Sequence, residues 1–133
     1  MIRSTYLRPR SLQEALDGKQ QRPDAVFIAG GTDLMVAWRD PRSRPGVIIS
    51  LRSVPELKGV SAEGRLRIGA GETILDLLAS AELAEHCPVL LRAAARLGSQ
   101  QIRAVATLGG NLANASPCAD TATPLLVHEA SVV

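Results

Sequence analysis

Two pairs of adjacent glycines carry the clearest chemical signal in the sequence. The first pair lies in the stretch Phe27-Ile28-Ala29-Gly30-Gly31-Thr32-Asp33-Leu34, where an apolar run breaks and a new one begins. This pattern predicts a strand, a tight turn and a helix start. Glycine lacks the Cβ that would keep a ligand away from the backbone, and amides at a helix start lack partners. The stretch therefore indicates an anion site suited to a pyrophosphate, with an ordinary strand-to-helix turn as the alternative.

The second pair repeats this chemistry about 80 positions later. In Thr107-Leu108-Gly109-Gly110-Asn111 a hydroxyl and two glycines again interrupt an apolar run. Two such turns facing one another could hold a diphosphate between unpaired N–H groups, with hydroxyl donors from Thr32 and Thr107. Neither turn has the spacing of a dinucleotide-binding GxGxxG or of a GxxxxGK[ST] phosphate loop, so the sequence supports neither of those sites.

Length and composition narrow the class of protein. The chain has 133 residues, enough for one modest domain or two small lobes, and 46% hydrophobic residues predict a packed core rather than disorder. Aromatic residues make up only 2%, too few for a base-stacking platform. With 15 basic and 13 acidic residues, the charge is too balanced to favour nucleic acid or an anionic membrane as a partner.

Cysteine and histidine are too sparse to predict a metal centre. Cys87 and Cys118 form no CxxC pattern, and His86 and His128 lie far apart, so the sequence predicts neither zinc nor an iron–sulfur cluster on this chain. No acid–base pair or nucleophile triad stands out, so no catalytic residue is assigned. The sequence has no signal peptide and no apolar run of membrane-spanning length, from which a cytoplasmic location is expected.

The first half of the chain predicts a small α/β lobe, residues 1–53. Strands are expected within residues 1–9, 25–29 and 47–51, the last because of its β-branched run. Ser11 and Glu14 match a capping box for a helix over residues 12–17, which Gly18 is expected to end. A second short helix is expected over residues 33–39.

The second half, residues 54–133, predicts a larger α+β lobe. Two alternating runs around Glu63-Gly64 indicate a hairpin, and Thr73 and Asp76 form a capping box that opens a helix. A helix beginning at Pro88 is expected to bury the face that carries Leu90, Leu91, Ala94 and Leu97. Asp120 is expected to cap a final helix, and Ala130-Ser131-Val132-Val133 looks like the start of a strand whose remainder is missing.

These residues, taken in order, resemble the FAD-binding or medium subunit of the molybdenum hydroxylases, the family of xanthine dehydrogenase and carbon monoxide dehydrogenase. The resemblance covers nearly the whole chain. It lies in the segments Ala29–Leu34, Gln101–Arg103, Thr107–Leu112, Ala115–Pro117 with Asp120, and Pro124–Leu126.

The resemblance implies the FAD-binding fold shared with vanillyl-alcohol oxidase, truncated here, in which two lobes clasp an extended FAD. The two glycine turns would contact the pyrophosphate, Leu97 would lie near the adenine, and Asp120 would hydrogen-bond the cofactor on the adenosine side. The implied cofactor-binding residues are Phe27, Ile28, Ala29, Gly30, Gly31, Thr32, Asp33, Leu34, Leu97, Thr107, Leu108, Gly109, Gly110, Asn111 and Asp120.

The resemblance also implies a redox role and two partner chains. In this family electrons leave a molybdenum centre on a large subunit and cross two [2Fe–2S] clusters on a small subunit. They then reach FAD, which passes them to NAD⁺ or another acceptor. Family members continue beyond the length of this chain, so a truncated, flavin-free assembly fragment of the same fold is the alternative function. A phosphate-binding module for another nucleotide is a third interpretation.

Overall fold

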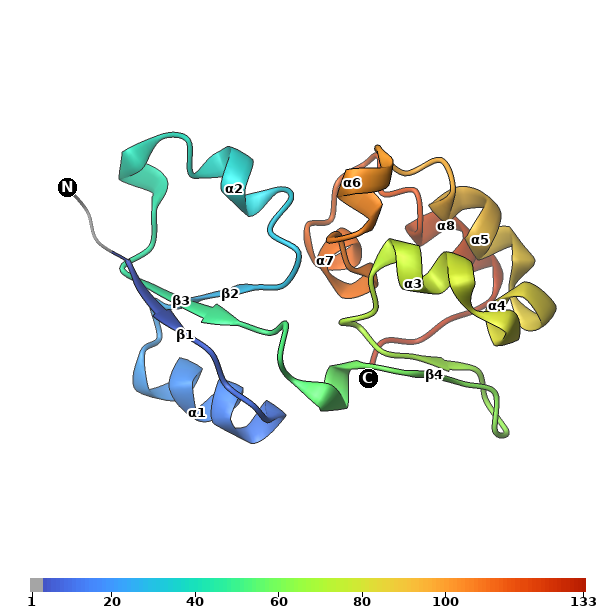
Figure 1. Ribbon diagram of the computed structural model, residues 1–133, viewed down its shortest axis with the longest axis horizontal. Helices are drawn as coiled ribbons and strands as arrows, with labels where there is room; N and C mark the ends of the chain where they lie inside the picture. Colours follow the sequence, from blue (N-terminus) through green and yellow to red (C-terminus); the bar gives the residue numbers. More distant parts are fainter. Residues whose placement is uncertain (1–3) are drawn as a thin grey trace.

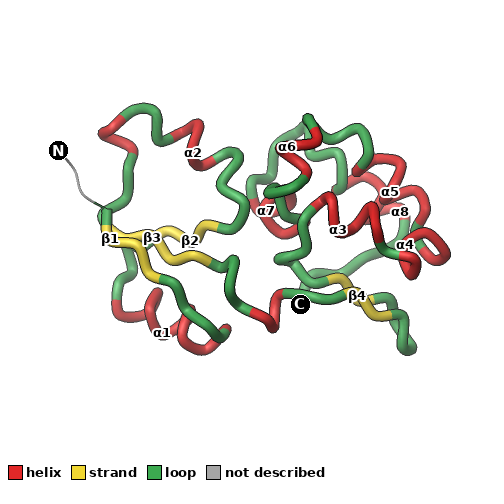
Figure 2. Tube along the Cα trace, in the orientation of Figure 1, coloured by secondary structure: helices red, strands yellow, loops and turns green. Residues whose placement is uncertain are grey.

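The computed structural model describes residues 4–133, and its elements form two groups, each with its own apolar core (Figure 1). The expected first strand is observed over the described part as β1 (Thr5–Leu7), whereas Met1 to Arg3 lie outside the described residues. The architecture mixes helices with a parallel and an antiparallel strand pairing, in agreement with the predicted α+β class (Figure 2).

A three-stranded parallel sheet forms the first group. The strands β1, β2 (Val26–Ile28) and β3 (Val47–Ser50) pair in the order β1-β3-β2, so the β-branched run of β3 occupies the centre. Helix α1 (Leu12–Gln21) lies against one side of this sheet (Figure 1). The buried residues Ala15, Ala25, Ile49 and Val54 form the core of this group. The sequence assigns both Val54 and Leu57, which packs on this core, to the second lobe. The boundary after residue 53 stays a prediction.

Helix α1 is longer than expected. Ser11 caps it by accepting a hydrogen bond from the amide of Glu14, as predicted, but the helix continues through Gly18 to Gln21. The buried face of α1 packs on the sheet through Ala15, and the Lys19 ammonium donates to the carbonyls of Pro23 and Ala25. These tertiary contacts outweigh the local helix-breaking tendency of glycine, which is only about 1 kcal/mol.

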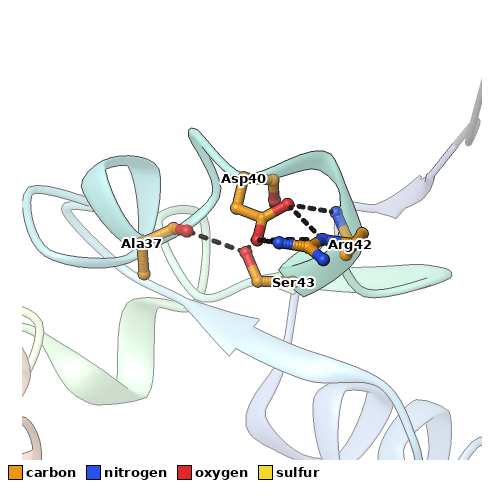
Figure 3. Close-up of polar contacts among 4 residues, drawn as sticks. All are labelled: Ala37, Asp40, Arg42 and Ser43. Atoms are coloured by element: carbon orange, nitrogen blue, oxygen red, sulfur yellow. Dashed lines mark hydrogen bonds and ion pairs between the residues drawn. The ribbon is translucent and has the colours of Figure 1, made fainter.

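The connection from β2 to β3 holds one helical turn, α2 (Leu34–Ala37), and a 3₁₀ turn, η1 (Pro41–Ser43). In Figure 3 the Ser43 hydroxyl donates to the carbonyl of Ala37, and the Arg42 guanidinium pairs with the Asp40 carboxylate at 3.0 Å. Hydrogen bonds from Arg42 lower the pKa of Asp40. The pair is exposed, so it orders the loop locally and adds little to the stability of the fold.

The 3₁₀ turn η2 (Pro55–Leu57) packs on the first group and leads into the second, which begins with the predicted hairpin, β4 (Val60–Ser61) paired with β5 (Arg67–Ile68). Six short helices follow and bury the larger core around Leu77, Leu83 and Leu90. They are α3 (Ile74–Ala79), α4 (Ala81–His86), α5 (Pro88–Ala94), α6 (Gln100–Arg103), α7 (Leu108–Ala113) and α8 (Ala122–Val127).

Several sequence predictions for this half are confirmed. The capping box at Thr73 and Asp76 is present in both directions and opens α3. Pro88 begins α5, and of the four residues on the expected buried face Leu90, Ala94 and Leu97 are buried, whereas Leu91 is half-buried against the same core. His86 and His128, which the sequence does not assign to a metal site, lie at the ends of α4 and α8.

Two expectations near the end of the chain are wrong. The residue that caps α8 is Thr121, so Asp120 stands one residue before the cap and cannot fill that role. Val132 and Val133 form no strand and are exposed. Within residues 4–133 no helix is long and apolar enough to span a membrane.

Candidate functional site

A cavity of about 640 Å³ lies where the loop after β2 faces α6 and α7, and both glycine motifs line it. The first group of elements contributes Phe27, Ala29, Gly30, Gly31, Thr32, Asp33, Leu34 and Leu51 to the lining. The turn η2 contributes Leu57, and the second group contributes Ala70, Gly71, Leu97, Ile102, Ala106, Thr107, Gly109, Gly110, Asn111, Ala113 and Asn114. The cavity therefore brings together twelve of the fifteen predicted site residues.

The loop after β2 forms an open wall of this cavity. No described residue accepts a hydrogen bond from the backbone amides of residues 30–33. Gly31 has a φ of 76°, a left-handed conformation that favours glycine, and it lies in the loop between the end of β2 and the start of α2. Because α2 has a single turn, a helix dipole adds little to the site. The unpaired amides themselves are the donors that this wall offers.

The missing Cβ of Gly30 lets the two groups of elements come into contact and does not open space for a ligand. A Cβ on Gly30 would overlap the carbonyl oxygen of Val105 and lie 2.9 Å from the Cα of Ala106. The two backbones thus approach more closely than any other residue type allows. The sequence predicted that the missing Cβ leaves room for a ligand, whereas in the structure the backbone before the second motif fills that room.

The second glycine motif is not a turn with free amides, which corrects the sequence prediction. Gly109 and Gly110 lie in the first turn of α7, and Thr107 caps that helix. The amides of Leu108 and Gly109 donate to the carbonyls of Glu72 and Ala70, at 3.0 and 2.8 Å. The amides of Gly110 and Asn111 both donate to Thr107, to Oγ1 at 3.1 Å and to the carbonyl at 2.9 Å. All four backbone amides of residues 108–111 are therefore hydrogen-bonded within the protein.

Side chains provide the donors that remain on the second wall. The Thr107 hydroxyl accepts from Gly110 and keeps its own hydrogen to donate. The Asn111 carboxamide accepts from the Thr121 hydroxyl through Oδ1, at 2.5 Å, and keeps its N–H₂ group. Both Thr107 and Asn111 line the cavity opposite the open loop.

The electrostatics of the lining are unusual for an anion site. Asp33 is the only charged residue in the lining, and no lysine or arginine belongs to it. An anion bound here would be held by neutral amide, hydroxyl and carboxamide donors.

The three predicted residues outside the lining fall into two kinds. Ile28 and Leu108 are buried, with 8% and 5% of their surface exposed, and they support the lining from within the protein. Asp120 is exposed and lies outside the cavity.

Sequence reasoning missed eight residues of the lining, namely Leu51, Leu57, Ala70, Gly71, Ile102, Ala106, Ala113 and Asn114. The run Gly69-Ala70-Gly71 before the Thr73 capping box was the available signal. A Cβ on Gly69 or Gly71 would lie within 3 Å of the Leu57 carbonyl oxygen or overlap it, so these glycines let two segments cross beside the cavity.

The site has the composition of a binding site rather than of a catalytic one. Neutral hydrogen-bond donors face one another, and apolar side chains such as Leu51, Leu57, Leu97 and Ile102 offer a surface for a flat, apolar ligand group. Among residues 4–133, no cluster of three histidine, cysteine or acidic side chains could hold a metal ion.

Both glycine motifs lie on the walls of one cavity, and comparison with known proteins gives the family. Residues 2–133 match the family described as the FAD binding domain in molybdopterin dehydrogenase, and the chain belongs to this family. The match extends over nearly all of the chain.

Curated relatives and solved structures agree with this assignment. The chain is 34% identical to the xanthine dehydrogenase FAD-binding subunit of Escherichia coli O157:H7, over 97% of the chain and 45% of the relative. It is 33% identical to the nicotinate dehydrogenase FAD-subunit of Eubacterium barkeri, over 96% of the chain and 44% of the relative. The chain thus spans a little under half the length of the curated relatives it matches.

Among solved structures, reconstituted CO dehydrogenase from Oligotropha carboxidovorans superposes with a TM-score of 0.85 at 31% identity, covering 90% of this chain and 42% of that one. Quinoline 2-oxidoreductase from Pseudomonas putida 86 superposes with a TM-score of 0.81 at 34% identity, covering 86% and 40%.

Proposed function

We propose that this chain forms the cofactor-holding part of an FAD-dependent electron-transfer subunit in a molybdenum-containing dehydrogenase. One observation carries the proposal: the unpaired amides of residues 30–33 face Thr107 and Asn111 across a single cavity. Diphosphate oxygens are acceptors only, and every polar group just named is a donor. The family membership and the FAD-subunit names of the relatives support FAD as the ligand.

Each part of the cofactor has a proposed set of contacts. The amides of residues 30–33, the hydroxyls of Thr32 and Thr107 and the carboxamide of Asn111 would bind the pyrophosphate, and Leu97 would lie beside the adenine. Arg103 donates to the carbonyls of Leu97 and Gly98, at 3.0 and 2.9 Å, which fixes the segment that carries Leu97. Asp120 remains a proposed hydrogen-bond partner on the adenosine side, which requires the ligand to extend past the cavity.

The chemistry belongs to the bound flavin, which exchanges electrons singly or in pairs, while this chain binds and orients it. We propose that electrons arrive from a [2Fe–2S] small subunit and a molybdenum-cofactor large subunit, and leave to NAD⁺ or another acceptor. The lobes 1–53 and 54–133, the fold shared with vanillyl-alcohol oxidase and a cytoplasmic location belong to the same proposal.

Flavin binding by the purified chain tests the proposal. The chain is incubated with excess FAD and desalted, its visible spectrum is recorded, and released flavin is identified by chromatography. Retention of stoichiometric FAD is expected. Failure to retain or titrate with FAD would contradict the proposal and favour a flavin-free assembly fragment, whereas equal affinity for ADP and FAD would favour a module for another nucleotide.

A further inference from the structure

We infer that Thr121 is a positioning residue for the cofactor site: its hydroxyl orients the carboxamide of Asn111 so that the N–H₂ group is the part presented to the ligand. This inference rests on the proposed function, because it assigns a role toward the diphosphate of the same cofactor.

The environment of Thr121 supports this role. Thr121 is completely buried, and its hydroxyl donates to Oδ1 of Asn111 at 2.5 Å, across ten positions in the chain. A buried hydroxyl needs a partner, and within residues 4–133 the Thr121 hydroxyl bonds only to this carboxamide. Thr121 also stands at the N-cap of α8, where a threonine side chain usually accepts a hydrogen bond from the helix, yet it makes no such bond. Its side chain is directed toward Asn111 instead.

The orientation of Asn111 decides what α7 can offer a ligand. The backbone amides of residues 108–111 are already used within the protein, so the donors left on this wall are side chains, those of Thr107, Asn111 and Asn114. A carboxamide has a donor end and an acceptor end. With Oδ1 held by Thr121, the donor end remains for the cavity. Without Thr121 the carboxamide is free to rotate, and its oxygen would repel a phosphate.

A double-mutant cycle tests the inference. Dissociation constants for FAD and ADP are measured by titration calorimetry for the wild-type chain, Thr121→Val, Asn111→Ala and the double variant. Thr121→Val is expected to weaken both ligands about tenfold, as for a lost hydrogen bond to a charged group. In the Asn111→Ala background the same substitution is expected to have no further effect, because Thr121 acts through Asn111. Thr121→Ser, which keeps the hydroxyl, is expected to restore binding.

Two further variants make the result unambiguous. Thr123→Val, on an exposed position of α8 outside the cavity, is the matched control and should bind as wild type. Asn111→Asp leaves Thr121 in place but presents only acceptors, so it should bind more weakly than Asn111→Ala. This variant tests the need for a donor even if Thr121→Val fails to fold, which thermal unfolding would reveal.

Three results would overturn the inference. They are unchanged affinity in Thr121→Val, additive losses in the double variant, and wild-type binding by Asn111→Asp. If the wild-type chain binds neither FAD nor ADP, the proposed function fails and this inference fails with it. FAD binding that is insensitive to Thr121 overturns the positioning role alone.

Discussion

The two glycine motifs look alike in sequence but differ in what their backbones do. The amides of residues 30–33 make no hydrogen bond within the described chain, whereas those of residues 108–111 are all used internally. The first motif is a loop that ends in one turn of helix, and the second is the capped first turn of α7. The first motif therefore offers backbone donors to a ligand, and the second offers side chains from a rigid support.

The difference shows that a glycine pair can serve three purposes that the sequence does not separate. Gly31 supplies a left-handed conformation, Gly30 allows the backbone at Val105 to approach, and Gly109 allows Ala70 to approach, since a Cβ there would lie 2.8 Å from the Ala70 Cβ. None of these three roles is contact with a phosphate. The capacity of the first motif to bind a ligand comes from its unpaired amides. Those amides do not depend on the residue type being glycine.

The largest expected effect separates Gly30 from Gly110. Gly30→Ala forces a Cβ into the Val105 carbonyl, so we expect a loss of about 1–3 kcal/mol or more in the free energy of unfolding. A Cβ on Gly110 meets only the Thr107 Oγ1, at 2.9 Å, and alanine favours the helix by up to about 1 kcal/mol. Moving that hydroxyl weakens the cap on α7, at a cost of about 1–2 kcal/mol that the helix preference of alanine partly offsets, so Gly110→Ala should destabilise the chain less than Gly30→Ala does. Urea unfolding of both variants measures the two free energies.

This pair of variants can break the comparison. If Gly110→Ala destabilises the chain more than Gly30→Ala does, the close approach at Val105 is not the constraint that we assign to Gly30. Equal stabilities combined with a loss of FAD binding only in Gly30→Ala would return that glycine to the ligand contact expected from the sequence.

The next largest effect on stability is expected at Thr107, whose side chain caps α7. Thr107→Val removes the acceptor of the Gly110 amide, and loss of such a cap costs about 1–2 kcal/mol. Thr107 is nearly buried, so water cannot readily replace the hydroxyl. Urea unfolding checks the stability, and hydrogen exchange at the Gly110 amide checks the site. An unchanged exchange rate at Gly110 would argue against the capping role.

The sequence predicted local features well, because short-range patterns determine them. The β-branched run of β3, the capping box of Thr73 and Asp76, and the buried face with Leu90 and Ala94 were all recognisable within a few residues. The twelve predicted residues that line the cavity follow from the two motifs and the family resemblance.

The features that the sequence missed depend on segments far apart in the chain. The amide of Gly109 is occupied only because Ala70 lies beside it, and helix α1 passes through Gly18 because the sheet supports its buried face. Thr121 was missed because its partner, Asn111, lies on another helix. Asp120 and Thr121 are adjacent, and local pattern alone gave no reason to prefer the second as the cap.

A smaller effect is expected at Asp76, which caps α3 beside the second motif and should make the stability depend on pH. Thr73 pairs with Thr107 in an isolated antiparallel β-bridge. Thr73 also caps α3 together with Asp76. Hydrogen bonding from the Thr73 side chain, with smaller contributions from its amide and the charge of Lys58, lowers the pKa of Asp76 from its ordinary value despite partial burial. A lowered carboxyl pKa stabilises the fold above the unfolded-state value, and this stabilisation is lost as the pH falls through the folded-state value.

We therefore expect Asp76→Asn to be less stable than wild type at neutral pH, with the difference disappearing below about pH 4. Thermal unfolding between neutral and acidic pH measures it. Glu85→Gln is the control, because it neutralises an exposed carboxyl group within α4. A difference that persists at acidic pH would show that the Asp76 charge is not what stabilises the helix start.

The smallest effect on stability is expected at Thr32, and it is the sharpest contrast with Thr107. The Thr32 hydroxyl makes only a long contact with the adjacent Asp33 carboxylate, at 3.4 Å. Thr32→Val should change the free energy of unfolding by no more than about 0.5 kcal/mol. FAD binding should nevertheless weaken by about 1 kcal/mol or more, since a donor to the diphosphate is lost. Urea unfolding and FAD titration of the same preparations measure both quantities, with Thr123→Val as the control. A variant that loses stability but keeps its affinity would mean that the first motif, like the second, supports the fold rather than the ligand.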